Sequence, residues 1–297
     1  MKAIYELAAP AKLNLFLHVV GRRPDGYHLL QSAFVLIDWC DLLHIERRDD
    51  GLLQRHDLGA PLPDDDLCLR AARSLQMESG TGLGADILID KQIPWGAGMG
   101  GGSSDAATTL LALNRLWELD WPLSRLLALG LQLGADVPFF LAGRNAWVEG
   151  IGERLTPIDL PPQRFAVVKP AASIATQAIF QSPLLVRDTE AVIVAGFLAD
   201  VAVCVSIDKL VQGFGRNDLQ PAAQASCDEV AQAARLLEAR FGNSRMTGSG
   251  SAVFARTHEI DGTESQPLAT LPELPAGWVG RMCRSLQQHP LAGWAAD

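Results

Sequence analysis

One glycine-rich segment constrains the fold of this chain more than any other part of its sequence. Residues 93–105 contain five glycines and two serines, and they lead directly into an apolar run at 106–117 whose periodicity predicts a helix. Ser103, Ser104 and Asp105 are residue types that favour the cap or the first turn of such a helix. The chain must therefore place a glycine-rich turn at the start of a helix.

A glycine loop in this position is suited to bind an anion. Without Cβ atoms, the backbone N–H groups can approach a phosphate closely, and the N–H groups of the first helical turn have no partner within the helix. Adjacent serine hydroxyls can add bonds to phosphate oxygens or to a phosphate-bound Mg²⁺. The competing interpretation is a flexible loop followed by an ordinary capped helix.

The residues around the glycines exclude some types of phosphate site. No Gly-Lys-Ser or Gly-Lys-Thr follows them, so the loop is not of the Walker type. Gly96, Gly98 and Gly101 match the G-x-G-x-x-G spacing of dinucleotide folds, and Glu118 lies near the distance of the ribose-binding acid. The context argues against that fold, because residues 91–94 separate the glycines from the preceding strand and Glu118 lies at the end of the helix itself.

The composition of the 297 residues excludes several classes of protein. Hydrophobic residues make up 48% and charged residues 20%, so the chain can build substantial cores. The net charge of −9 argues against nucleic acid or an anionic membrane as a partner and leaves small molecules as the expected ligands. Five cysteines without a C-x-x-C pair indicate a reduced, cytoplasmic location. The histidines lack the spacing of a zinc site, and no apolar run is long enough for a transmembrane helix.

Alternation near the N-terminus predicts a strand with two polar groups on one face. Lys12, Asn14, Phe16 and His18 fall on that face, while the intervening residues are leucines. Lys12 and Asn14 would lie about 7 Å apart, a spacing that suits binding of an oxyanion or a hydroxyl group. A solvated sheet face is the alternative interpretation.

Two further segments carry candidate site residues. Residues 21–28 form a predicted turn with two arginines, a tyrosine and a histidine, which is either an exposed turn or a lid over a polar ligand. Asp136 is a lone carboxylate before an apolar run, and spacing alone favours helix capping over a desolvated site carboxylate.

The remaining patterns predict a mixture of strands and helices. Strands are expected at 32–37, 42–46 and 164–169, and an amphipathic helix at 228–241. The glycine–serine segment at 247–251 is expected to form a hairpin turn that enters a strand. The proline-rich residues at 160–162 mark the expected domain boundary.

Three segments, in order, resemble the motif pattern of the GHMP small-molecule kinases. They are Pro10-Ala11-Lys12-Leu13-Asn14-Leu15, the glycine loop at 96–104 and Thr247-Gly248-Ser249-Gly250. Within that family, the segments GRRPDGYH at 21–28, GADVPFF at 134–140 and RNDL at 216–219 are similar to members that phosphorylate a cytidyl alcohol in isoprenoid-precursor synthesis. The resemblance extends over residues 9–255.

The resemblance implies an α+β two-domain GHMP kinase fold. Residues 1–160 would form a ribosomal-protein-S5-like, ATP-binding N-terminal domain, and residues 161–297 a ferredoxin-like, substrate-binding C-terminal domain. ATP would be the phosphate donor, with Mg²⁺ carried by its phosphates. A small-molecule cytidyl alcohol would meet it between the two domains.

The resemblance also assigns roles to individual residues. Asp136 matches the catalytic aspartate, and Lys12 matches the active-site lysine. The triphosphate loop corresponds to Pro94, Trp95, Gly96, Ala97, Gly98, Met99, Gly100, Gly101, Gly102, Ser103 and Ser104. The cytidyl substrate would contact Asn14, Tyr27, His28, Thr176 and Phe180, with Phe180 stacked on cytosine and His28 hydrogen-bonded to it. Two positions depart from the family pattern: Met99 stands where leucine is usual, and Gln181 where some members carry lysine.

Three other functions compete with this interpretation. Another GHMP kinase, of the mevalonate or homoserine type, would keep the fold and change the substrate, but Tyr27, His28 and Phe180 argue against it. A non-catalytic ligand sensor on the same fold would be expected to lose Lys12 or Asp136, and both are present. A dinucleotide-binding oxidoreductase is the third alternative.

Overall fold

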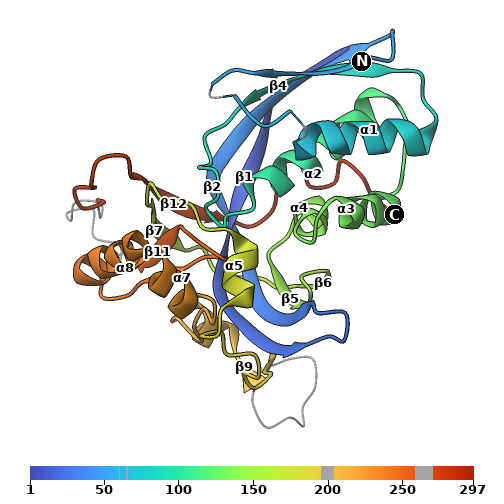
Figure 1. Ribbon diagram of the computed structural model, residues 1–297. Helices are drawn as coiled ribbons and strands as arrows, with labels where there is room; N and C mark the ends of the chain where they lie inside the picture. Colours follow the sequence, from blue (N-terminus) through green and yellow to red (C-terminus); the bar gives the residue numbers. More distant parts are fainter. Residues whose placement is uncertain (60, 65, 195–203, 258–269) are drawn as a thin grey trace.

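A long antiparallel ribbon of two strands runs through the whole molecule. The computed structural model describes residues 1–59, 61–64, 66–194, 204–257 and 270–297. Strands β1 (Ala3–Arg22) and β2 (His28–Arg48) form the ribbon, drawn in blue in Figure 1. The tight connection between them is the turn that the sequence predicts within residues 21–28.

The second strand is longer than the sequence predicts. The two expected strands at 32–37 and 42–46 are parts of the single strand β2. The polar residues between them do not interrupt it, because the register of the ribbon shifts between Pro10 and Ala11, opposite Cys40. Such an irregularity absorbs a residue that does not fit the alternation without ending the strand.

Further strands extend the ribbon into one large sheet. Its order is β10-β11-β7-β12-β2-β4-β3, and β5 joins β2 on a separate branch that continues to β6. In this sheet, β3 and β4 pair in parallel and the other neighbouring strands pair antiparallel. Because a dinucleotide-binding fold has a mostly parallel sheet, the described part of the chain does not have that fold. These strands are β3 (Leu53–Asp57), β4 (Gly84–Asp90), β5 (Ala146–Gly150), β6 (Arg154–Pro157), β7 (Arg164–Lys169), β10 (Arg245–Met246), β11 (Val253–Thr257) and β12 (Val279–Leu286). A separate parallel pair is formed by β8 (Ile193–Val194) and β9 (Cys204–Val205).

The helices form two groups on opposite sides of the ribbon. Figure 1 shows the group α1 (Leu67–Ser79), α2 (Gly101–Leu116), α3 (Leu123–Leu133) and α4 (Val137–Ala142) on one side, and α7 (Gln220–Ser226) with α8 (Asp228–Phe241) on the other. Short helices α5 (Thr176–Gln181) and α6 (Ile207–Val211) complete the set in the described residues. None of the described helices is long and apolar enough to cross a membrane.

Each group of helices covers its own apolar core. Leu110 and Leu113 of α2 pack with Ile45 of β2 in the first core, and Val230 and Leu237 of α8 pack against β7 and β11 in another. Helix α8 and strand β7 have the bounds that the sequence predicts. Strand β7 begins just after the prolines at 161 and 162, and the domain boundary placed there stays a prediction.

Candidate active site

The predicted phosphate loop is a run of left-handed turns that ends in a helix. Gly96, Gly98 and Gly100 have φ angles of 63°, 71° and 73°, a region that residues with a Cβ rarely adopt. Helix α2 begins at Gly101, earlier than the apolar pattern predicts, and Gly100 is its N-cap without a side-chain hydrogen bond. Backbone N–H groups at this helix start are therefore left for a ligand.

The third motif segment packs directly on this loop. A Cβ on Gly98 would lie 2.4 Å from the carbonyl oxygen of Thr247, so the two backbones touch. Ser251 N donates to Gly96 O at 3.1 Å, and Ala252 N donates to Ala97 O at 3.1 Å. The glycine–serine segment at 247–251 is the hairpin turn between β10 and β11, and it also supports the phosphate loop.

Lys12 and Asn14 join the first motif segment to both loops. Lys12 N donates to Met99 O at 2.9 Å, and its Nζ donates to Asn14 Oδ1 at 2.7 Å. Asn14 Oδ1 also accepts from Gly248 N at 2.9 Å. The two side chains share one face of β1, as predicted, but Lys12 is 3% exposed and Asn14 1%, which excludes a solvated sheet face.

Asp136 lies beside Lys12 at the start of α4. Its Oδ2 is 3.5 Å from Lys12 Nζ, and its side chain keeps 30% of its exposure. Asp136 occupies the N-cap position but makes no side-chain capping bond, so the capping role favoured by spacing is not what the carboxylate does. A Cβ on Gly100 would lie 3.3 Å from Lys12 Cε and 2.9 Å from the ring of Phe140, so the ammonium group, the carboxylate and the phosphate loop meet.

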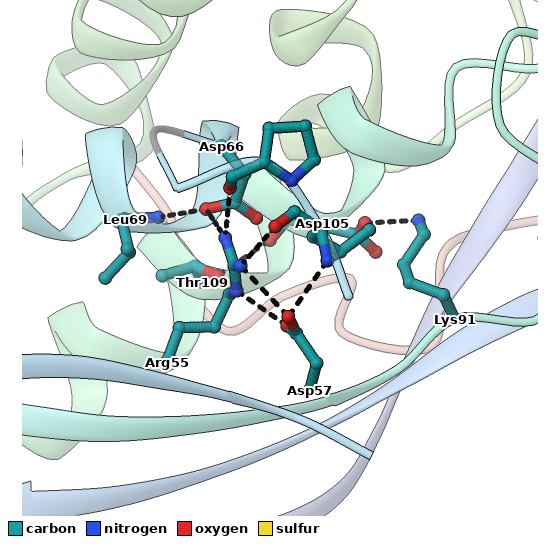
Figure 2. A network of polar contacts seen from close by, with 9 residues as sticks. Arg55, Asp57, Asp66, Leu69, Lys91, Asp105 and Thr109 are labelled. Carbon is teal, nitrogen blue, oxygen red and sulfur yellow. Dashed lines mark hydrogen bonds and ion pairs between the residues drawn. The ribbon is translucent and has the colours of Figure 1, made fainter. Parts of the chain in front are cut away.

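A buried charge cluster under the loop was not anticipated from the sequence. Lys91 Nζ donates to Asp105 Oδ2 at 2.6 Å and bonds Asp41 as well (Figure 2 draws the Asp105 contact). Asp41 Oδ1 accepts from the backbone N–H of Gln92 and of Ile93, which fixes the chain as it enters the loop. Asp105, expected as a cap or first-turn residue, is thus an ion-pair partner. The signal for it was the position of this carboxylate directly before the apolar run at 106–117.

The charges in this cluster shift each other's protonation. Burial raises the pKa of the Asp105 carboxyl well above its ordinary value, while Lys91 opposes the rise. Burial alone would lower the pKa of Lys91, but the two carboxylates raise it, so the lysine stays charged. Figure 2 also shows Arg55 bonded to Asp57 and Asp66 close by, where Asp66 caps α1. The segment that carries the phosphate loop is therefore anchored by the buried network of Lys91, Asp41 and Asp105.

A cavity of about 650 Å³ lies at the other end of the site. Three predicted substrate residues, Tyr27, His28 and Phe180, line it. Thr176 lies next to its wall, where Thr176 Oγ1 and Ser249 Oγ share a hydrogen bond of 2.7 Å. Asn14 does not line it, since that side chain is buried under the third motif segment.

His28 and Phe180 form the aromatic part of this cavity. Their rings stack with centroids 4.9 Å apart and planes 27° from parallel. Burial and the positive charges of Arg187 and Arg22 lower the pKa of His28, so the imidazole is neutral at pH 7. Arg187, which donates from Nε to His28 Nε2 at 3.2 Å, was missed in the sequence because no motif includes it.

The cavity is adjacent to the Lys12–Asp136 pair. Ile151 lines the cavity, and a Cβ on the neighbouring Gly152 would lie 4.0 Å from Asp136 Oδ1. A ligand that places an aromatic group in the cavity can thus extend toward the carboxylate and the phosphate loop. The arrangement suits transfer of a phosphate between two bound molecules.

Comparison with known proteins gives the class of this protein. The family model described as GHMP kinases N terminal domain matches residues 66–144, and the model for the C-terminal part of GHMP kinases matches residues 204–264. The chain belongs to the GHMP kinase family. It is therefore an ATP-dependent phosphotransferase, and the α+β two-domain fold class expected from the sequence is confirmed.

Individual relatives narrow the class further. The chain is 64% identical to the 4-diphosphocytidyl-2-C-methyl-D-erythritol kinase of Methylibium petroleiphilum, with 99% of each chain covered. A crystal structure of 4-(cytidine 5'-diphospho)-2C-methyl-D-erythritol kinase superposes with a TM-score of 0.72 at 36% identity, covering 86% of this chain and 90% of that one. A homoserine kinase from Cytophaga hutchinsonii shares the fold at 16% identity, with a TM-score of 0.65 and coverage of 97% and 96%.

Proposed function

We propose that this chain transfers the γ-phosphate of ATP to the 2-hydroxyl group of 4-diphosphocytidyl-2-C-methyl-D-erythritol, a step of non-mevalonate isoprenoid-precursor synthesis. The observation that carries the proposal is the Lys12–Asp136 pair beside the glycine loop, next to a cavity with a stacked His28 and Phe180. The identity with kinases named for this substrate supports the choice of acceptor. Free cysteines at 40, 68, 227 and 283 support a cytoplasmic location.

The phosphate loop holds ATP in this proposal. Backbone N–H groups within residues 95–103 would bond the β- and γ-phosphates at the start of α2, where the helix dipole favours negative charge. Mg²⁺ would arrive bound to the phosphates of ATP, since this ion usually keeps substrate phosphates and waters among its ligands. Such a Mg²⁺ would neutralise phosphate charge, and the half-buried Ser103 could bond it through its hydroxyl.

Asp136 and Lys12 act on the acceptor hydroxyl. Asp136 Oδ2 would accept the proton as the hydroxyl oxygen bonds the γ-phosphorus. The bond between the γ-phosphorus and the β,γ-bridging oxygen would break, and ADP would leave with that oxygen and its electron pair. The Lys12 ammonium group, 3.5 Å from that carboxylate, would stabilise negative charge that develops on the attacking oxygen. Asn14 would hold Lys12 in place through its 2.7 Å hydrogen bond rather than contact the cytidyl group.

The cytidyl group would occupy the cavity. One face of Phe180 is covered by His28, so the base would stack on the opposite face or separate the two rings. Tyr27 is 61% exposed and lies at the cavity wall, where it can close over the base. Thr176 would contact the substrate from the start of α5.

An assay of ATP consumption with a panel of acceptors tests the function. We expect turnover with the cytidyl-methylerythritol substrate and none above background with mevalonate or homoserine. ADP formation measured by a coupled enzyme, together with mass spectrometry of the product, gives the readout. Turnover with mevalonate or homoserine and none with the cytidyl alcohol would reject the proposed acceptor.

A further inference from the structure

Arg187 connects two elements that line the cytidyl cavity, the end of α5 and the start of β2. Its Nη2 donates to the carbonyl oxygens of Phe180 and Ser182 at 2.9 and 3.0 Å, and its Nη1 donates to Leu185 O at 3.0 Å. Its Nε donates to His28 Nε2 at 3.2 Å. Among the described residues its guanidinium group thus bonds three carbonyls and one imidazole, and it forms no ion pair with a carboxylate.

These bonds join elements that are far apart in the sequence. Phe180 and Ser182 lie at the C-terminal end of α5, where helix carbonyls lack partners within the helix and carry the negative end of the dipole. His28 is the first residue of β2, and its ring stacks on Phe180. The planar guanidinium group, with donors in a fixed fork, can hold both at once, and a lysine ammonium group cannot reproduce that geometry.

The bond to His28 determines which ring nitrogen carries the proton. A neutral imidazole has one N–H donor and one acceptor nitrogen, and either nitrogen can take either role. The guanidinium group has donors alone, so His28 Nε2 must accept and the proton must lie on Nδ1. The described residues provide no hydrogen-bond partner for Nδ1, so its N–H is free to bond a ligand in the cavity that His28 lines.

We propose that Arg187 is a positioning residue that sets the specificity for cytosine, by holding His28 as the Nδ1–H tautomer against Phe180. The N3 atom of cytosine carries a lone pair and accepts this N–H, whereas N3 of uracil carries its own hydrogen and opposes it. A buried donor that meets another donor leaves both unsatisfied, which disfavours the uridyl analogue. The identity of the base rests on the proposed function, but the Arg187–His28 contact does not.

Nitrogen NMR of the unliganded protein tests the contact without any substrate. We expect ¹⁵N shifts of His28 in the wild type to report a protonated Nδ1 and an unprotonated Nε2 at pH 8. Arg187→Met should release the ring to a mixture of tautomers. Arg144→Met is the matched control, because Arg144 is exposed, pairs with Asp159 and does not line the cavity. A protonated Nε2 in the wild type, or an unchanged tautomer in Arg187→Met, would overturn the proposal.

Base discrimination tests the consequence for specificity. We expect the ratio of kcat/KM between cytidyl and uridyl methylerythritol diphosphates to fall by at least about tenfold in Arg187→Met, the loss of one hydrogen bond in a partly buried site. Arg187→Lys, which keeps the charge, should lose most of the same preference, while Arg144→Met should keep it. An unchanged ratio in both Arg187 variants would reject the specificity role. Failure of every variant and of the wild type to turn over would reject the proposed acceptor instead, and the NMR result would still stand.

Discussion

The phosphate end and the base end of the site are built in different ways. At the phosphate end, Lys12 and Asn14 are almost fully buried, and three separate chain segments meet through backbone contacts and glycines. At the base end, Tyr27 is 61% exposed, and half-buried His28, Phe180 and Arg187 form the wall with their side chains.

This difference predicts how many segments of the chain a substitution at each end should disturb. A substitution at the phosphate end disturbs several segments together, because Lys12 bonds the backbone of Met99 and Gly98 packs directly against the backbone of Gly248. A substitution of an aromatic side chain at the base end, such as Phe180, removes ring contacts and leaves the backbone in place. We therefore expect changes in kcat at the phosphate end and changes in KM for the acceptor at the base end.

The largest effect is expected for the charged pair. Asp136→Asn and Lys12→Ala should each lower kcat by at least about a hundredfold, because they remove proton acceptance or charge stabilisation in the transition state. Steady-state kinetics at saturating ATP and acceptor measures this. Asp159→Asn, a change in an exposed ion pair with Arg144, is the control. A kcat near the wild-type value in either site variant would reject these roles.

A smaller and different effect is expected at the base end. Phe180→Leu should raise KM for the cytidyl acceptor about tenfold by removing a stacking surface, with kcat and KM for ATP nearly unchanged. Phe241→Leu, at the end of α8 and outside the cavity, is the matched control. If Phe180→Leu lowers kcat instead and leaves KM alone, the two ends are not separable in this way.

Substitution of the glycine at the N-cap of α2 is expected to lower kcat by about the same factor as Phe180→Leu raises KM. Gly100→Ala should lower kcat about tenfold, because its Cβ would lie 2.9 Å from Phe140 and 3.3 Å from Lys12 Cε at a φ of 73°. Gly242→Ala is the control for backbone strain alone, since Gly242 has a φ of 71° with no atom near its Cβ. Equal loss of activity in both variants would mean that strain, and not displacement of Lys12, is the cause.

The smallest effect at neutral pH concerns the support of α4, the helix that Asp136 precedes. His289 N donates to Gly143 O at the end of that helix, and burial lowers the pKa of His289 to about 4. The unfolded chain therefore binds a proton between about pH 6.5 and 4 that the folded chain does not, so stability falls as the pH falls through this range.

Urea unfolding at several pH values measures this loss. His289→Asn keeps an acceptor for Leu291 N and should remove up to about 3 kcal/mol of the decrease between pH 6.5 and 4. The free energies of unfolding of the two proteins should show different slopes against pH. Parallel slopes would show that acid destabilisation arises elsewhere, for instance at His28 in the base end.

Much of the site could be predicted from local patterns and the family resemblance. The glycine loop lies at a helix start, Lys12 and Asn14 share a face of β1, and Tyr27, His28 and Phe180 line one cavity. Spacing alone gave a capping role to Asp136, because a single carboxylate before a helix has no other partner nearby in the sequence. Its partner Lys12 lies in strand β1, far from Asp136 in the sequence.

The amino-acid sequence by itself determined the local conformations: where glycine permits left-handed turns, where alternation makes β1, and where periodicity makes α8. These depend on residues a few positions apart, so a linear pattern contains them. Only the tertiary structure decided that Lys12 meets Asp136, that Asp105 meets Lys91 and that Arg187 meets His28. Those pairings depend on which segments pack together, because burial makes a charged or polar group bond whichever partner the fold brings within reach.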